Sequence, residues 1–378
     1  MTDTTKNEEM LLIEKNHVIP LITRFGIIQN ELGQILDLPV PSDPVIQAAV
    51  GWWEKLTPES QYACREVLAA LASPLIIADI GINSGNEMLV NTHAIVPSMR
   101  WNDPLFLLGE QDNGARLKLE RLKEGDLLLN TLLLYLGNAE TLYELDMKFE
   151  IPLTDFVVFT GMTDLAVRLR YRSLLDHKPY TASMKMDDIV TSVDDAFALR
   201  DPRWLLAFLL PVLHTSHDRF SRDAIRASVN NLVRIGLVKS DGGETHSFTV
   251  AGTTFAESAG RYRNIVRIDA YGTGKDGRNG RQSQIFIRGE NFLWYAGIGG
   301  KNGDSVVVAA LDLAKAEALL KEVFTPVAVP KPVAAPTPAA APDNADTKSA
   351  QKTHFCPRCG AQVQPGKKFC SQCGAKMG

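Results

Sequence analysis

A run rich in proline and alanine divides the chain into two parts that must fold separately. Residues 325–354 read "TPVAVPKPVAAPTPAAAPDNADTKSAQKTH". Proline disrupts helices and small side chains cannot fill a core, so we expect a semi-extended tether that reaches at most about 90 Å. The tether separates a body, residues 10–324, from a cysteine-rich module at 355–378, and the polar residues 1–9 are expected to be disordered.

The module holds four of the chain's five cysteines, arranged as two pairs. Two residues lie within each pair and ten lie between the pairs, and the four ligands would be Cys356, Cys359, Cys370 and Cys373. This spacing lets both pairs bind one metal from tight turns. Four thiolates in a closed tetrahedral shell select Zn²⁺ and leave no position for water. We therefore predict one structural zinc ion per chain, whose binding supplies the folding energy of the module.

The segments "FCPRCG" and "FCSQCG" resemble the two knuckles of the short zinc-ribbon family, over about 24 residues. The resemblance implies that the module is a zinc ribbon. Two alternatives use the same cysteines: iron bound as in rubredoxin, and a dithiol redox switch.

Charge is unevenly divided between the tail and the rest of the chain. Six basic residues and no acidic residue follow Asp346, so the remainder carries 34 basic and 44 acidic residues. The basic tail could bind RNA, DNA or an acidic protein, or it could be the solvated surface of a module with almost no interior. The chain as a whole has no polycation character that would indicate nucleic acid.

No segment is typical of export or of membrane insertion. The start, "MTDTTKNEEM", lacks the apolar stretch of a signal peptide. The longest apolar run, "WLLAFLLPVL" at 204–213, is about half the length that spans a bilayer. We expect a cytoplasmic protein without a membrane partner, in which reduced thiols favour metal over disulfides.

The body carries signals of both helices and strands and is expected to be α+β. Apolar periodicity predicts helices at 45–55, 58–72, 126–136, 163–176, 203–213, 221–235 and 312–323. Apolar runs bounded by turn residues predict strands at 87–96, 104–109, 115–122, 246–250, 263–270, 283–288, 291–297 and 305–311. Thr57 is expected to cap the second helix. Cys64 on that helix is expected to be a small buried side chain.

Two segments of the body follow the same pattern. Residues 105–136 and 293–324 each contain an apolar strand ending at glycine, a polar turn, a second strand and a leucine-rich helix with an acidic start. We predict an internal duplication, with halves at about 10–160 and 161–324 and either two sheets or one shared sheet. Chance is the alternative, because hairpins followed by helices are common.

This layout resembles that of the type VII secretion-associated chaperones called EspG. The resemblance rests on "LTPESQYACREVLAALASPLIIADI" with "DLLLNTLLLYL" in residues 55–136, and on "SVVVAALDLAKAEALLKEVF" in residues 260–324. It implies a duplicated α+β body that binds proteins and is not catalytic. The tether and the cysteine module are departures from that family.

A further pattern, at 203–256, is winged-helix-like. After the apolar run, "FSRDAIRASVNNLVRIGLVKSDGGETHSFTVAGTTFA" resembles the second half of winged-helix DNA-binding domains. Ser221 would cap the helix, and one face would carry four polar residues: Arg222, Arg226, Asn230 and Arg234. Such a face could lie in a major groove, or it could be an ordinary solvated face. Asp241 and Glu244 in the following hairpin would repel phosphates.

Catalytic motifs are missing from the sequence. No HExxH, Walker loop or GxSxG pattern occurs, and "GTGKDG" at 272–277 lies between strands, without the helix that a phosphate site needs. His214 and His217 are interpreted as loop or capping residues rather than metal ligands. The acidic residues of "MDDIVTSVDD" are interpreted as exposed helix starts rather than paired catalytic carboxylates, and they are Asp187, Asp188, Asp194 and Asp195.

The first hypothesis is a cytoplasmic, non-enzymatic, zinc-binding adaptor or chaperone-like protein without an evident small-molecule substrate. It would bind a protein partner through its body and its tethered zinc ribbon. The second hypothesis is a DNA-binding transcriptional regulator that uses the winged-helix-like segment and the basic tail. The third is an enzyme whose site forms only in three dimensions, in a pocket lined by carboxylates or histidines with shifted pKa values.

Overall fold

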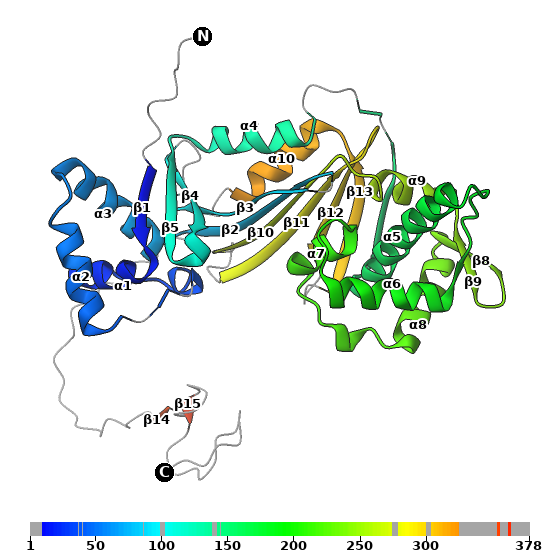
Figure 1. Ribbon diagram of the computed structural model, residues 1–378, viewed down its shortest axis with the longest axis horizontal. Coiled ribbons are helices and arrows are strands. Elements are labelled where there is room, and N and C mark those ends of the chain that lie inside the picture. Colours follow the sequence, from blue (N-terminus) through cyan, green and yellow to red (C-terminus); the bar gives the residue numbers. More distant parts are fainter. Residues whose placement is uncertain are drawn as a thin grey trace, which may run out of the picture. The chain divides into compact units, whose positions relative to one another are not determined.

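The structure is a computed structural model (Figure 1). It describes residues 10–36, 38–39, 41–85, 87–98, 103–137, 142–143, 145–273, 279–299, 304–324, 354–355 and 362–363. The body belongs to one compact unit, Met1–Pro330, and the tail to a second unit, Lys331–Gly378. The body is α+β, as predicted. The predicted tether lies outside the described residues apart from its last residue, His354.

A single antiparallel sheet of ten strands forms the centre of the body. In spatial order the strands are β1 (Met10–Glu14), β5 (Arg116–Leu122), β4 (Leu105–Gln111), β3 (Glu87–Val96), β2 (Ile76–Ser84), β10 (Asn264–Thr273), β11 (Asn279–Arg288), β12 (Leu293–Gly299), β13 (Ser305–Leu311) and β6 (Lys148–Pro152). Of the two sheet arrangements that the sequence left open, the described residues form one shared sheet.

The strand order is symmetric about the centre of the sheet, because from either edge one single strand is followed by a meander of four strands. Two meanders, β2–β3–β4–β5 and β10–β11–β12–β13, meet at the central pair of β2 with β10. The helix α4 (Gly125–Tyr135) follows the first meander, and α10 (Leu313–Phe324) follows the second. Both segments singled out in the sequence therefore have the expected order of strand, strand and helix. The predicted hairpin of 283–288 with 291–297 is confirmed by the pairing of β11 with β12.

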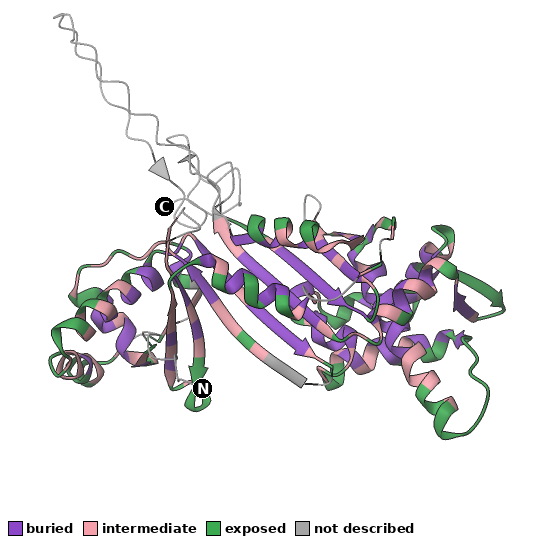
Figure 2. Ribbon diagram, turned by 90° about the horizontal axis from the view of Figure 1, so that it is seen from above, coloured by how far each residue is buried: buried purple, intermediate pink, exposed green. Residues whose placement is uncertain are grey.

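The helices form three groups on the two faces of the sheet. On one face, α4 and α10 pack over Ile80 of β2 and Ile268 of β10. The other face carries α1 (Val18–Arg24), α2 (Asp43–Trp53) and α3 (Pro58–Ala72) near β1–β5. Near β11–β13 and β6 it carries α5 (Leu153–Leu175), α6 (Met186–Leu199), α7 (Leu205–Leu213), α8 (Arg222–Arg234) and α9 (Val250–Ala259). Buried residues follow the central strands and exposed residues gather on the outer helices (Figure 2).

Local capping fixes several helix starts as the sequence indicates. The Thr57 hydroxyl accepts a hydrogen bond from the amide of Ser60 at 3.3 Å, at the start of α3. Ser221 accepts from the amide of Ala224 at 3.3 Å, at the start of α8. Side-chain oxygens at this position satisfy amides that have no partner within the helix. Cys64 is buried in α3, as predicted, and burial raises the pKa of its thiol to about 12.

Four helices differ from the sequence-based expectation. The helix α5 begins at Leu153, ten residues before the predicted start, and α1, α6 and α9 were not predicted. The first half of α5 is buried on all sides, including the polar Thr160 and Asp164, so it lacks the one-sided apolar pattern that marks a surface helix. Asp187 and Asp188 lie in the first turn of α6, as helix-start residues. Asp194 and Asp195 lie further along the same helix.

A second, small sheet stands beside α8. Its three strands are β7 (Met184–Lys185), β9 (Thr245–Phe248) and β8 (Val238–Gly242), in that order. The hairpin of β8 and β9 follows α8 directly, as predicted, and Gly242 and Gly243 give it its tight tip with φ of 107° and 60°. None of the helices in the described part of the chain is long and apolar enough to cross a bilayer.

Candidate functional site

The four predicted zinc ligands, Cys356, Cys359, Cys370 and Cys373, lie outside the described residues. Two short strands are described around the first pair in sequence, β14 (His354–Phe355) and β15 (Gln362–Val363), and they pair antiparallel. Four thiols with this spacing are a donor set that fits Zn²⁺. Within the described ranges, no group of three or more His, Cys, Asp or Glu side chains could hold a metal ion.

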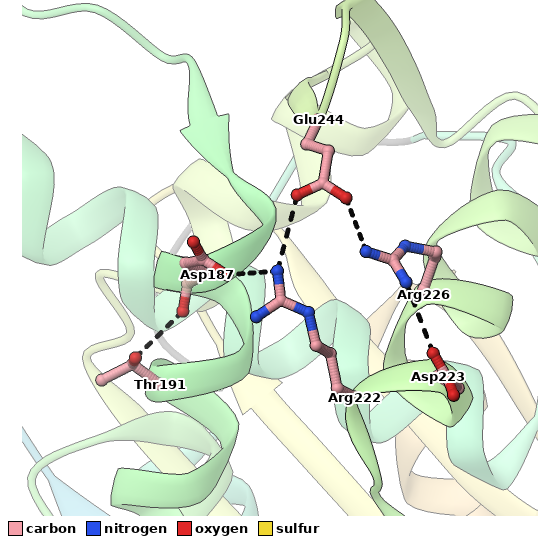
Figure 3. Close-up of polar contacts among 6 residues, drawn as sticks. All are labelled: Asp187, Thr191, Arg222, Asp223, Arg226 and Glu244. Carbon is pink, nitrogen blue, oxygen red and sulfur yellow. Dashed lines mark hydrogen bonds and ion pairs between the residues drawn. The ribbon is translucent and has the colours of Figure 1, made fainter.

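The predicted nucleic-acid surface lies on α8, where ion pairs engage its first two arginines (Figure 3). Arg222 Nη2 lies 2.5 Å from Asp187 Oδ1 and 3.5 Å from Glu244 Oε2. Arg226 Nη2 lies 2.5 Å from Glu244 Oε1, and its Nη1 lies 3.4 Å from Asp223 Oδ1. Glu244, between β8 and β9, thus contacts both arginines, so a phosphate would have to compete with carboxylates that are already in place.

Asn230 and Arg234, the other two residues of this face, differ from Arg222 and Arg226 in their contacts. Asn230 is exposed. Arg234 is exposed and donates to Asn231 Oδ1, through Nε at 3.1 Å and through Nη2 at 2.5 Å. Asn231 in turn donates to the buried carboxylate of Asp155. Nucleic-acid binding by this face stays a prediction, since its arginines lie near one another but have partners within the body.

A groove that the sequence did not reveal lies between α5, the start of α7 and the end of α9. Its walls include the side chains of Tyr171, Arg203, Trp204, Arg261 and Tyr262, and its volume is about 540 Å³. These residues come from three segments that are distant in sequence. Single aromatic and arginine residues are common on helices and in loops, so only the packing of α5, α7 and α9 marks them as a set.

Buried polar contacts hold the aromatic walls of this groove in place. The carboxylate of Asp164 on α5 accepts from the amides of Leu205 and Leu206 at 2.9 Å each, which fixes the start of α7 next to Trp204. The Tyr262 hydroxyl donates to the Arg203 carbonyl at 3.3 Å. It also accepts from Asn83 Nδ2 at 3.0 Å. Burial raises the pKa of the Tyr262 hydroxyl, which therefore stays neutral.

The groove continues onto an exposed apolar surface at the end of α5. Tyr171, Leu174 and Leu175 are 55%, 63% and 81% exposed. Their spacing along the helix places them on one side of its last turns. A cation lies nearby: the guanidinium carbon of Arg168 is 4.5 Å from the ring centroid of Trp204, and Arg168 Nη1 is 3.1 Å from Asp195 Oδ2. Apolar side chains that are this exposed, beside a groove, are typical of a surface that binds another molecule.

A polar cluster occupies the centre of the sheet on the face that carries α7. The carboxylate of Asp269 on β10 is 2.6 Å from Arg281 Nε, 2.7 Å from Ser283 Oγ and 2.8 Å from His214 Nε2. Arg281 also donates to the carbonyl of Val212 at 3.0 Å. The cluster therefore ties the C-terminal end of α7 to the sheet.

The two candidate histidines do not form a site together. His214 ends α7 in the left-handed conformation, with φ of 44°, and contacts Asp269. His217 contacts Asp194 Oδ1 at 2.8 Å. Both act as structural partners of carboxylates, in line with the capping interpretation of "HTSHD".

Comparisons with known proteins give two findings. Residues 355–377 match the family described as a zinc-ribbon domain, so the tail carries a zinc-ribbon match at the place that the cysteine spacing indicates. Over the whole chain, one similar solved structure is that of the Mycobacterium tuberculosis type VII secretion system chaperone EspG5 in complex with the PE25–PPE41 dimer. The identity is 9%, the match covers 84% of this chain and 97% of that chain, and the TM-score is 0.40. None of the curated proteins matches the chain.

Proposed function

We propose that this protein is a non-enzymatic, zinc-binding adaptor or chaperone-like protein. Its body would bind a protein partner, and the tethered zinc ribbon would supply a second contact. The observation that carries the proposal is the groove lined by Tyr171, Trp204 and Tyr262, which continues onto exposed Leu174 and Leu175.

The residue types of the groove support a protein partner. Trp, Tyr and Arg provide most of the binding energy in protein interfaces, because each buries a large area and has a polar group for orientation. Arg261 donates only weakly, to the carbonyl of Glu257 at 3.4 Å, and Arg172 is exposed without an ion pair in the described part of the chain. The partner that fits is therefore a segment with apolar anchors and acidic flanks.

The tail would act through one zinc ion held by Cys356, Cys359, Cys370 and Cys373. When bound, zinc would cross-link the two cysteine pairs, and the closed thiolate shell leaves it a structural role. A flexible tether raises the local concentration of a second binding module without fixing its geometry. This chemistry requires reduced thiols, and we place the protein in the cytoplasm for that reason.

We further infer that the body arose by duplication. The two repeated segments begin at Leu105 and Leu293, which are 188 positions apart. Ile80 and Ile268, also 188 positions apart, pair with each other across β2 and β10. A two-fold axis through this pair would relate the two meanders, as expected when two copies of one unit join edge to edge.

The winged-helix-like segment is proposed as a structural part of the protein-binding body. In its favour, α8 precedes the hairpin of β8 and β9, and the short β7 completes the small sheet. DNA binding by this segment is less favoured, because Asp187 and Glu244 already contact Arg222 and Arg226.

Affinity capture from a cell lysate tests the proposal. The full chain should recover a partner, and Leu175→Asp should lose it, because a charge replaces an exposed apolar anchor. Ile28→Asp is the matched control, since Ile28 is 84% exposed and Leu175 is 81% exposed, but Ile28 follows α1. Equal recovery by both variants would place the partner elsewhere on the body. If no variant recovers a partner and the purified protein retains duplex DNA, the transcriptional regulator replaces the adaptor.

A further inference from the structure

The groove of Tyr171, Trp204 and Tyr262 presents hydrogen-bond donors with few acceptors. Its described walls hold these three aromatic residues and two arginines, and the other wall residues are two glycines and Val167. None of the side chains in the described walls is a carboxylate or an amide. The groove therefore offers aromatic surface and donors, with tyrosine hydroxyls as the only side-chain acceptors in that part of the walls.

Three of the donors are available to a bound molecule. The Tyr171 hydroxyl and the Trp204 indole N–H make no hydrogen bond within the described ranges. Tyr171 is 55% exposed, and the indole N–H of Trp204 is not a buried atom. Arg261 makes only the 3.4 Å contact from Nε to the Glu257 carbonyl, so most of its guanidinium N–H groups are unused.

Charge alone does not identify the ligand, because carboxylates near the groove already pair with arginines. Asp201 Oδ2 lies 2.6 Å from Arg203 Nη2, and Glu257 Oε1 lies 3.9 Å from Arg170 Nη1. A bare phosphate or carboxylate would gain little from these two arginines. The aromatic rings and the unused donors are therefore the features that select a ligand.

The backbone of the bound segment must supply acceptors, which argues for an extended conformation. An α-helix uses most of its carbonyls in internal hydrogen bonds. An added strand needs the free edge of a sheet, and no edge strand of either body sheet contributes a described wall residue. A polyproline II segment has no internal hydrogen bonds, and its prolines lack the N–H, so its carbonyls are free acceptors. Grooves lined by aromatic residues are the surfaces that recognise such segments.

We propose that this groove binds a proline-rich segment of a partner protein in the polyproline II conformation. The inference rests on the proposed function and names the kind of segment that the adaptor binds. Prolines would pack against the rings of Tyr171, Trp204 and Tyr262, and backbone carbonyls would accept from Trp204 and Arg261. Free proline-rich chains already populate this conformation, so binding costs less conformational entropy than ordering a flexible segment would.

The chain has a proline-rich run of its own, which fits the groove less well in charge. Residues 325–342 contain Lys331 and no acidic residue. A lysine beside Arg261 is unfavourable, whereas a carboxylate there is favourable. The segment that fits therefore belongs to a partner and has acidic residues beside its prolines.

Fluorescence anisotropy with the full chain and labelled synthetic peptides tests the proposal. One peptide consists of prolines and leucines with a glutamate at each end, and the comparison peptide has alanine at every proline position. We expect saturable binding of the first with one site per chain, and binding of the second weaker by about tenfold.

Two variants locate the binding in the groove. Tyr171→Ala should weaken binding of the proline peptide by about tenfold, because an aromatic wall is lost. Trp204→Phe keeps a ring and removes the N–H, so it should weaken binding by about fivefold. Tyr62→Ala is the matched control and should bind as the parent does, since Tyr62 is a 75% exposed tyrosine on another helix, α3.

Several results would overturn the proposal. They are the absence of saturable binding, equal affinity for the alanine peptide, and undiminished binding by Tyr171→Ala. A peptide of residues 325–342 that binds as tightly would assign the groove to the chain's own run instead of a partner. Oligothymidylate that binds more tightly and competes with the peptide would assign it to single-stranded nucleic acid. If Leu175→Asp loses its lysate partner although no proline peptide binds, the adaptor stands and only the polyproline II segment is wrong.

Discussion

The Asp164 carboxylate on α5 accepts a hydrogen bond from the Leu205 amide at the start of α7, at 2.9 Å. Its second oxygen accepts from the Leu206 amide at the same distance. The side chain lies in the core, and burial raises the pKa of its carboxyl to about 7, although the two amides lower it. The joint between two core helices, and with it the aromatic wall of the groove, therefore depends on a carboxyl that titrates near neutral pH.

This carboxyl should make the stability of the body depend on pH. The folded pKa of about 7 lies above the ordinary value of 3.8, so the native state holds the proton more tightly. The stabilising effect is fully present below about pH 4 and is lost as pH rises through about 7. Between about pH 5 and pH 8 we expect the free energy of unfolding to fall by about 3 kcal/mol from this group alone.

Urea unfolding at both pH values, for the parent chain and for Asp164→Asn, measures this effect. Asparagine cannot titrate, so the variant should show a flatter profile and lower stability near pH 5. Asp176→Asn, at the exposed end of α5, should keep the parental profile. A parent chain with the same pH slope as Asp164→Asn would show that Asp164 is ionised throughout.

Local chemistry explains which elements the sequence could predict. A serine or threonine cap and a one-sided apolar face can each be recognised from residues that are close in sequence. The helices α3 and α8 have both features. The first half of α5 is enclosed by other elements, so its pattern carries no period, and its start was predicted ten residues too late. The aspartates of α6 were interpreted as exposed helix starts, which fits Asp187 and Asp188 in its first turn but not Asp194 and Asp195, which lie further along the helix.

The candidate sites also differ in whether nearby residues alone predict them. The spacing of the four cysteines predicts a metal site, because all four ligands lie close together in sequence. The groove of Tyr171, Trp204 and Tyr262 depends on strand register and helix packing between distant segments. No short pattern encodes that register, although the 188-residue offset between Ile80 and Ile268 does agree with the repeat seen in the sequence.

The polar cluster at the centre of the sheet should be important for stability. Asp269→Ala would leave Arg281, whose side chain is 30% exposed, without its carboxylate and would remove an acceptor from Ser283 and His214. Because Arg281 reaches solvent, the main loss is that of the buried hydrogen bonds, which is expected to cost about 2 kcal/mol. Chemical denaturation of the full chain measures the change in the free energy of unfolding.

A surface pair provides the control for this variant. Asp201 pairs with Arg203, whose side chain is 64% exposed, at 2.6 Å. Asp201→Ala should therefore cost no more than about 1 kcal/mol. If the two variants lose equal stability, the cluster does not hold α7 to the sheet in the way that the contacts indicate.

Metal removal should unfold the tail and leave the body intact. The tail belongs to a separate compact unit, and a module of this size folds only with its metal. Elemental analysis should give one zinc per chain, and Cys370→Ser should lose it. The thermal unfolding midpoint of the body should be unchanged in this variant and after chelation. Zinc retained in full by Cys370→Ser would refute the four-sulfur assignment.

The carboxylate of Glu244 allows a test that separates the adaptor from the DNA-binding alternative. Glu244→Gln should leave Arg222 and Arg226 with less negative charge around them, at a stability cost of no more than about 1 kcal/mol because the pairs are exposed. The body's acidic excess and Asp241 in the hairpin still oppose phosphates. We therefore expect neither the parent chain nor Glu244→Gln to bind duplex DNA at low salt, as measured by fluorescence anisotropy.

The control is Asp223→Asn, which removes only the longer contact of Arg226, at 3.4 Å. Salt-sensitive DNA binding that is tighter in Glu244→Gln and lost in Arg222→Ala with Arg226→Ala would reverse the expectation. Such a result would mean that Arg222 and Arg226 contact DNA phosphates once Glu244 no longer pairs with them. It would assign α8 to the major groove and make Glu244 an inhibitory contact of that helix.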